Sequence, residues 1–245
     1  MAFADLVLGA LAALLATTLG SLLIFGYRRI SGLTHSAMLA LAAGVMAYSA
    51  IEMLGQAHNS AGDFVLASGF AIGLAGIFIL ERTLPHIHMI IRRKEIEHAK
   101  KKAALLAGTI TIHNIPEGFA IASAFASSTP LGWLVAASIA LQDIPEGFLV
   151  SAPLSYYGVD NRRALSFGFL SGVVEFIAAI ACYAFLSIIS VAVPGALAFS
   201  AGAMVYVVFV ELLPDAFKEG DKRIAALCFI LGAVGAFGLA ALLGF

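Results

Sequence analysis

Eight long apolar runs dominate this chain of 245 residues and restrict what it can fold into. A helix needs about 20 apolar residues to cross roughly 30 Å of hydrocarbon. The runs lack the alternation of polar and apolar residues that a membrane β-barrel requires. Only 12% of the residues are charged, against about a quarter in soluble domains. The sequence therefore predicts an all-α membrane protein of eight transmembrane helices, in a single domain over 1–245. The predicted spans are 4–27, 33–55, 62–84, 103–125, 130–156, 163–190, 193–216 and 223–244.

All 14 Lys and Arg residues fall in connections on one side of the predicted bundle, at 28–29, 82–102, 162–163 and 218–223. Cytoplasmic loops of membrane proteins carry the excess of basic residues. We therefore predict a cytoplasmic loop over 85–102 and both termini outside the cytoplasm. The short chain and small loops favour a bacterial inner (plasma) membrane. The bilayer is then the expected environment, and the basic loops favour orientation and lipid contact over nucleic-acid binding.

Two similar polar motifs interrupt the apolar runs, HNIPEG at 113–118 and QDIPEG at 142–147. Uncompensated polar groups at this depth cost several kcal/mol, so they usually have a function. Residues four apart share one helix face. Glu117 is therefore expected on the same face as His113, and Glu146 on the same face as Gln142. The proline of each motif removes a backbone donor and tends to kink the helix.

Glu175 in the sixth run adds a further carboxyl group at a comparable depth. One imidazole, four carboxylates and two amides suit a divalent transition metal. The charge of four acids matches two adjacent cations, with Glu117 and Glu146 placed to bridge them. Each residue alone could be a structural hydrogen-bond partner, but the repeated spacing favours a metal site. The candidate ligands are His113, Asn114, Glu117, Gln142, Asp143, Glu146 and Glu175.

An internal similarity also relates the second and seventh runs. The sequence AGVMAY at 43–48 resembles AGAMVY at 201–206, and Glu52 and Glu211 follow. The two runs cross in opposite directions, as do the two PEG motifs. We therefore predict an inverted repeat in a 3+2+3 arrangement, a plan that places transporter sites near the midplane.

At these motifs the chain resembles the ZIP family of divalent metal transporters, most closely its bacterial GufA-like branch. The resemblance implies a binuclear centre with His113, Glu117, Gln142 and Glu146 on one metal. It implies Asn114, Asp143 and Glu175 on the second, with Glu117 and Glu146 shared. It also implies that the Met46 thioether approaches the first metal, although a packing methionine is an equal alternative.

The resemblance further implies transport of Zn²⁺ toward the cytoplasm, with Cd²⁺, Fe²⁺, Mn²⁺ or Co²⁺ also accepted. The metal is then the transported substrate, and no cofactor is expected. Spans 1, 4, 5 and 6 would rock or slide against spans 2, 3, 7 and 8, and channel-like flux stays open. A homodimer is one assembly that the sequence allows. We predict that the protein is not an enzyme, because no HExxH motif and no paired nucleophile and base occur.

Two other classes of function compete with transport. In an intramembrane metal-dependent hydrolase, His113 and Glu117 would hold a metal that activates water. In a structural or sensory membrane protein, the buried polar groups would lack a transport role. A further group of polar residues, which we call the satellite residues, could either contact the metal along its path or be ordinary polar residues of the surface. These are His86, His88 and His98 in the cytoplasmic loop, Glu211 and Asp215 as an exit relay, and Glu52, His58 and Asp63 at the outer end.

Overall fold

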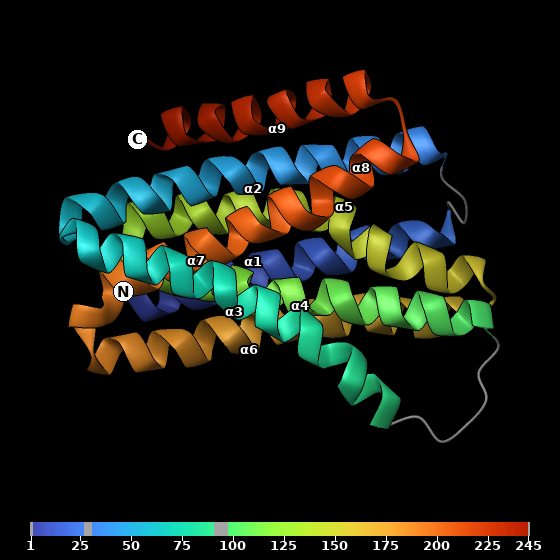
Figure 1. The fold of residues 1–245 in the computed structure, drawn as a ribbon, viewed down its shortest axis with the longest axis horizontal. Coiled ribbons are helices and arrows are strands. Elements are labelled where there is room, and N and C mark those ends of the chain that lie inside the picture. Colours follow the sequence, from blue (N-terminus) through green and yellow to red (C-terminus); the bar gives the residue numbers. More distant parts are fainter. Residues whose placement is uncertain (1, 27–30, 91–97, 245) are drawn as a thin grey trace.

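The computed structural model describes the backbone of residues 2–26, 31–90 and 98–244. It also describes their side chains, except those of residues 2, 81, 83–90, 98–112 and 219. The described residues form helices and contain no strand, so the all-α prediction is confirmed (Figure 1). The helices are α1 (Ala2–Leu22), α2 (Gly32–Ser60), α3 (Asp63–Ile90), α4 (His98–Ser127), α5 (Thr129–Tyr156), α6 (Asn161–Ile188), α7 (Val193–Tyr206), α8 (Leu213–Glu219) and α9 (Lys222–Leu243). Short η1 (Leu23–Phe25) and η2 (Ser190–Ala192) are 3₁₀ turns, and η3 (Val207–Leu212) is a π-helical segment.

Seven stretches of the described chain are long and apolar enough to cross a membrane. They coincide with seven of the eight predicted spans, and α7, η3 and α8 together make one of them, Ser190–Lys218. The remaining predicted span, 103–125, lies in α4, which has 30 residues. Its HNIPEG motif and first-turn lysines make α4 more polar than the others. The structure therefore agrees with a multi-pass membrane protein of seven to eight spans.

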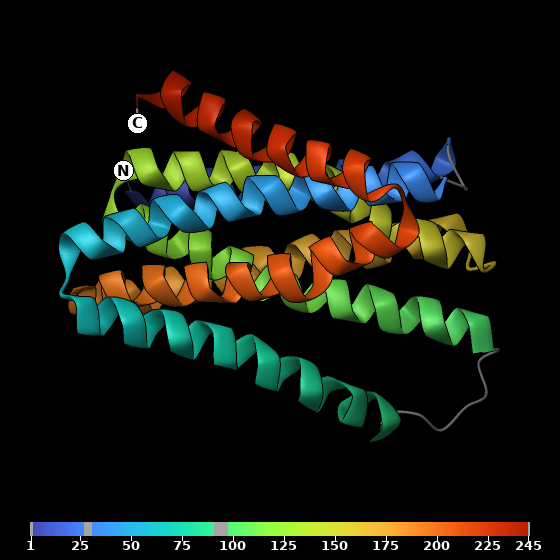
Figure 2. The same cartoon turned by 45° about the horizontal axis from the view of Figure 1, so that its top comes forward.

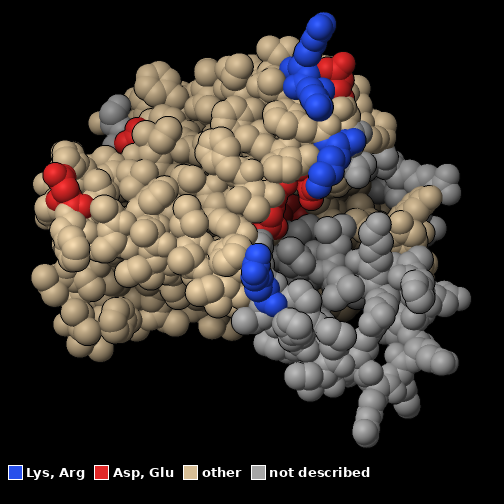
Figure 3. All heavy atoms as spheres, in the orientation of Figure 1, with Lys and Arg blue, Asp and Glu red and all other residues tan. Residues whose placement is uncertain are grey.

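The helices lie side by side along one long axis (Figures 1 and 2). Both termini lie at the same end of the bundle, which is the left end of Figure 1. In the same orientation, the visible Lys and Arg side chains gather toward the opposite end (Figure 3). Helix α3 continues beyond the predicted span end at 84 to Ile90.

Polar caps begin several of these helices in the positions that the sequence offers. The Ser31 hydroxyl accepts a hydrogen bond from Thr34 N–H, and Asp221 accepts one from Arg223 N–H. Such caps satisfy backbone donors that the first helical turn leaves unpaired. Between α5 and α6, Gly158 has φ 84°, a conformation that glycine adopts without steric cost.

Close glycine contacts hold α1, α4, α5 and α6 together, and we call these four helices the motif bundle. A Cβ atom at Gly20 would lie 1.9 Å from the carbonyl oxygen of Ile144, and one at Gly147 would lie 1.9 Å from that of Thr17. A Cβ atom at Gly118 would lie 2.4 Å from the carbonyl oxygen of Glu175. The α1 and α5 backbones therefore touch at two points, and α4 touches α6.

A second set of glycine contacts holds α2, α3, α9 and the seventh span (α7, η3 and α8), which we call the flanking bundle. A Cβ atom at Gly44 of α2 would lie 2.0 Å from Phe229 O of α9. A Cβ atom at Gly202 of α7 would lie 2.1 Å from Phe70 O of α3. None of the close contacts described for the glycines joins a helix of one bundle to a helix of the other. The tightest backbone packing therefore lies within each bundle.

Candidate metal centre

The predicted ligands account for the buried ionisable and amide side chains of the described part of the chain. Six of them are at most 4% exposed: His113, Asn114, Glu117, Gln142, Asp143 and Glu175. Every other buried polar side chain described belongs to serine or threonine. The seventh predicted ligand, Glu146, is half-buried. The helices therefore turn this set toward the protein interior and away from the apolar outer faces.

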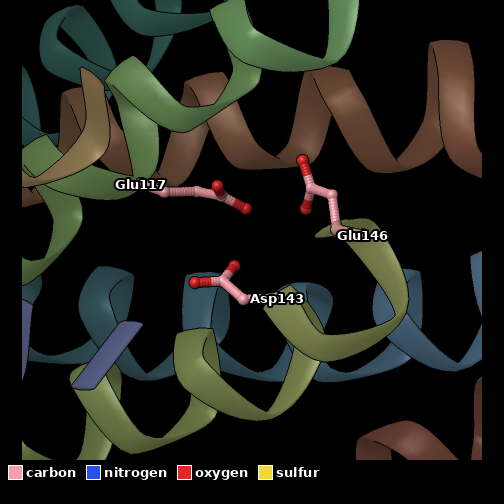
Figure 4. A group of neighbouring side chains, drawn as sticks. All are labelled: Glu117, Asp143 and Glu146. Carbon is pink, nitrogen blue, oxygen red and sulfur yellow. The ribbon is translucent and has the colours of Figure 1, made fainter. Parts of the chain in front are cut away.

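Three carboxylates form the centre of this set (Figure 4). Glu117 comes from α4, whereas Asp143 and Glu146 come from α5, and one oxygen of each lies within 4.8 Å of the others. Glu117 Oε2 and Asp143 Oδ1 are buried and have no hydrogen-bond partner. Buried acceptors without partners are costly, and a divalent cation would satisfy them. We call these three residues the carboxylate cluster.

Gln142 joins the carboxylate cluster through its amide. Its Nε2 donates a hydrogen bond to Glu117 Oε1, linking the QDIPEG motif to the HNIPEG motif. Gln142 Oε1 is buried and has no hydrogen-bond partner. The amide therefore keeps its carbonyl oxygen available as a metal ligand. Both helices continue through Pro116 and Pro145, so the two motifs meet on regular helical turns.

Asn114 and Glu175 lie beside the carboxylate cluster. Glu175 is fully buried, and neither of its carboxylate oxygens has a hydrogen-bond partner. It interacts electrostatically with Glu117, Glu146 and Asp143. The Asn114 carbonyl oxygen accepts a hydrogen bond from Ser171, while its Nδ2 has no partner. The structure thus gathers ligands from α4, α5 and α6 around one interior region.

Sequence reasoning missed two hydroxyl groups at this site. Thr17 Oγ1 of α1 lies 3.2 Å from Asp143 Oδ2, and Ser171 Oγ of α6 lies 3.0 Å from Asn114 Oδ1. The spacing of Ser171 four residues before Glu175 was a usable signal, because such residues share a helix face. Thr17 gave a weaker signal, as one of several polar residues in the first apolar run. Its partner became identifiable only when α1 was placed against α5.

His113 contacts a residue outside the set of ligands that the sequence predicted. Its Nε2 lies 2.9 Å from both carboxylate oxygens of Glu211. Glu211 belongs to the π-helical segment η3, whose extra residue per turn commonly marks functional positions. The contact joins the motif bundle to the flanking bundle. Glu211 is therefore a partner of His113 that the sequence pattern did not indicate, because the two positions are 98 apart.

Met46 packs in an apolar cluster with Ala50, Met53, Ile121 and Ile139. It is 2% exposed, and this packing accounts for its burial without a metal. This burial agrees with the packing alternative, and the thioether contact with a metal stays a prediction.

The satellite residues make local contacts. Glu52 accepts a hydrogen bond from the Tyr48 hydroxyl at 2.6 Å. Asp215 pairs with Lys218 at 2.9 Å on the surface. The remaining outer pair, His58 and Asp63, is exposed and lies 3.4 Å apart. The side chains of His86, His88 and His98 lie outside the described residues.

Comparison with known proteins decides the family. The family described as "ZIP Zinc transporter" matches residues 92–243, which include both motifs and Glu175. This chain belongs to the ZIP family. The resemblance inferred from the two motifs is thereby confirmed.

Bacterial ZIP relatives match most of the chain. Zinc transporter ZupT of Akkermansia muciniphila is 36% identical over 243 residues, covering 89% of this chain and 90% of the relative. Zinc transporter GufA of Myxococcus xanthus is 34% identical, covering 80% and 78% respectively. Zinc transporter ZIPB of Bordetella bronchiseptica is 33% identical, covering 92% and 77%. These proteins are named as transporters, and none is named as an enzyme, which counts against the hydrolase alternative.

Proposed function

We propose that this ZIP-family protein carries divalent transition metals, with Zn²⁺ as the main substrate, across a bacterial plasma membrane into the cytoplasm. One observation carries the proposal: three carboxylates converge from α4 and α5 inside an apolar helical protein, with buried oxygens that lack partners. Transported ions need ligands that replace their water at membrane depth, and carboxylates and amides supply them. The names of the relatives support Zn²⁺, and Cd²⁺, Fe²⁺, Mn²⁺ and Co²⁺ suit the same ligands.

Within this proposal the ligands divide between two adjacent ions. Glu117 and Glu146 bridge them, since their carboxylates face each other across the cluster (Figure 4). Gln142 and His113 complete the coordination of the first ion. His113 must give up its contact with Glu211 to do so. The second ion takes Asn114, Asp143 and Glu175, and the partnerless carboxylate oxygens of Asp143 and Glu175 support this assignment. Met46 stays a proposed thioether contact of the first ion, from the flanking bundle.

We propose that transport moves the motif bundle, which carries the ligands, against the flanking bundle. The glycine contacts support this division, because they bring backbones together within each bundle. Side chains can exchange partners across a boundary more readily than interlocked backbones can. The pairing of His113 with Glu211 crosses that boundary and would be remade during the movement. Rocking and sliding would both use this boundary.

An inverted repeat with a 3+2+3 order fits the same contacts. Gly44 of α2 packs on α9, and Gly202 of α7 packs on α3. These glycines occupy matching positions in the similar stretches 43–48 and 201–206. Under the repeat, α2 corresponds to α7 and α3 to α9, so the two contacts are equivalent. Equivalent close contacts between corresponding helices support a common origin of the two halves.

We propose that both termini face away from the cytoplasm. They lie together at one end of the bundle (Figure 1), and basic side chains gather toward the other end (Figure 3). Exposed Arg162, Arg163 and Lys222 lie in the first turns of α6 and α9 at that end. The excess of basic residues on cytoplasmic loops supports this orientation.

The experiment that tests transport uses purified protein in liposomes that contain a fluorescent Zn²⁺ indicator. Empty liposomes provide the leak rate. We expect Zn²⁺ entry that saturates with concentration and falls when Cd²⁺ competes for the carboxylate and amide ligands. Entry at the leak rate, by protein that remains folded, would overturn the proposed function.

A further inference from the structure

Two buried hydroxyl groups contact the proposed ligands. Thr17 on α1 is 1% exposed, and Ser171 on α6 is fully buried. Neither residue is a member of the carboxylate cluster. Each instead holds one atom of a ligand, Asp143 or Asn114. Their roles must therefore be sought in the ligands that they touch.

The close packing of α1 on α5 delivers Thr17 to Asp143. A Cβ atom at Gly147 would lie 1.9 Å from Thr17 O, so the two backbones touch one turn after Asp143. Thr17 Oγ1 lies 3.2 Å from Asp143 Oδ2 and 3.1 Å from the Ala13 carbonyl oxygen. Its single proton serves one acceptor at a time, and an ionised carboxylate is the stronger acceptor. Asp143 Oδ2 is then held in place, while Oδ1 stays free for a cation.

Ser171 does the same for Asn114. Its hydroxyl donates to Asn114 Oδ1 at 3.0 Å, and that carbonyl oxygen has a second lone pair. The hydrogen bond fixes the direction of the amide plane and keeps the oxygen pointed at α6. Glu175 lies four residues later on α6 and shares the face of Ser171. One face of α6 therefore supplies both a ligand and the support of another ligand.

We propose that Thr17 and Ser171 are positioning residues that orient Asp143 and Asn114 for the ion that these two ligands share. This inference rests on the proposed function, because it assumes that the two side chains bind metal. Groups that hydrogen-bond a metal ligand reduce the freedom that it loses on binding, and their loss typically costs about 10- to 100-fold in metal affinity or activity. The rest of the ligand set does not touch these two hydroxyls, so its affinity should change less.

The test for Thr17 compares Thr17→Val, which removes the hydroxyl at nearly constant volume, with Thr17→Ser, which keeps it. Thr18→Val is the matched control, because the Thr18 hydroxyl bonds only to Leu14 O at 2.7 Å among the described contacts. Zn²⁺ binding to the full-length protein in detergent is measured by calorimetry. Asp143→Asn identifies the binding step that depends on this carboxylate. We expect Thr17→Val to weaken that step by about 10- to 100-fold, with Thr17→Ser and Thr18→Val close to the unsubstituted protein.

Ser171→Ala is expected to weaken the same step, and Ser200→Ala is its control. Ser200 is equally buried, and its hydroxyl has no hydrogen-bond partner. Unchanged binding in Thr17→Val and Ser171→Ala would overturn the inference. A Thr17→Ser variant as weak as Thr17→Val, or equal weakening of every binding step, would also overturn it. An unsubstituted protein that binds no Zn²⁺ would instead overturn the proposed function, so the two failures are distinguishable.

Discussion

The Nε2 atom of His113 lies 2.9 Å from both carboxylate oxygens of Glu211. The contact joins α4 of the motif bundle to the π-helical segment η3 of the flanking bundle. The same nitrogen atom is the one that a metal would need if His113 binds through Nε2. Under the proposed function, a metal ion and Glu211 would then compete for the His113 side chain at the boundary between the bundles.

Removal of the Glu211 carboxylate should consequently strengthen metal binding. Hydrogen bonds to charged groups contribute about 1.5 kcal/mol or more, and about 1.4 kcal/mol corresponds to tenfold in affinity. We expect Glu211→Ala to bind Zn²⁺ about tenfold more tightly in calorimetric titrations. Asp215→Ala is the control, because Asp215 pairs with exposed Lys218 and should leave the affinity unchanged. Unchanged or weaker binding by Glu211→Ala would contradict the competition.

A methyl group at Gly20 should destabilise the protein. The added Cβ atom would lie 1.9 Å from the carbonyl oxygen of Ile144, so α1 would have to move away from α5. Overpacking of this kind costs about 1–3 kcal/mol. We expect Gly20→Ala to lower the thermal melting temperature in detergent by several degrees.

Gly235→Ala is the matched control for Gly20→Ala. A Cβ atom at Gly235 meets nothing within 4 Å, and alanine favours helix over glycine. Its melting temperature should therefore stay constant or rise. Equal melting temperatures for the two variants would show that α1 and α5 do not depend on this close approach.

The proposed orientation can be tested by cysteine labelling. Cys182 and Cys228 are first replaced with alanine, and a single cysteine is introduced as Asp63→Cys or Arg162→Cys. Both native side chains are exposed, and they lie in the first turns of α3 and α6, at opposite ends of the bundle. An impermeant maleimide should label the Asp63→Cys variant in intact cells, and the Arg162→Cys variant only after the cells are opened. The reverse pattern would place the termini in the cytoplasm.

The spans were predictable because they depend on local composition. A run of some 20 apolar residues has few alternatives to a membrane helix, and the observed helix boundaries lie close to the predicted ones. The departures have identifiable causes. The π-helical segment Val207–Leu212 lies within the seventh span, and its apolar residues around Glu211 gave no sign of a change in helix type. Helix α3 continues to Ile90 because a polar sequence can extend a helix beyond the hydrocarbon.

The candidate ligands were predictable from two properties of the sequence. Polar groups within apolar runs are costly in free energy to bury, so they usually have a function, and residues four apart share a helix face. That argument works within one helix. It placed Glu117 beside His113, whereas the structure turns the imidazole toward Glu211 on another helix. Thr17 and Asp143 are 126 residues apart and meet because glycines let α1 approach α5. Contacts between distant helices depend on packing that the pattern of one run does not contain.

Under the proposed function, metal crosses the membrane through the carboxylate cluster. Zn²⁺ entry into indicator-loaded liposomes should be compared for the unsubstituted protein, Glu117→Gln and Glu52→Gln. Both variants replace a carboxylate with an amide of similar shape, but Glu52 is half-buried on α2 and bonds to Tyr48. We expect Glu117→Gln to fall to the rate of empty liposomes and Glu52→Gln to retain saturable transport. Transport by folded Glu117→Gln at the unsubstituted rate would contradict the claim that the cluster is the path of the ion.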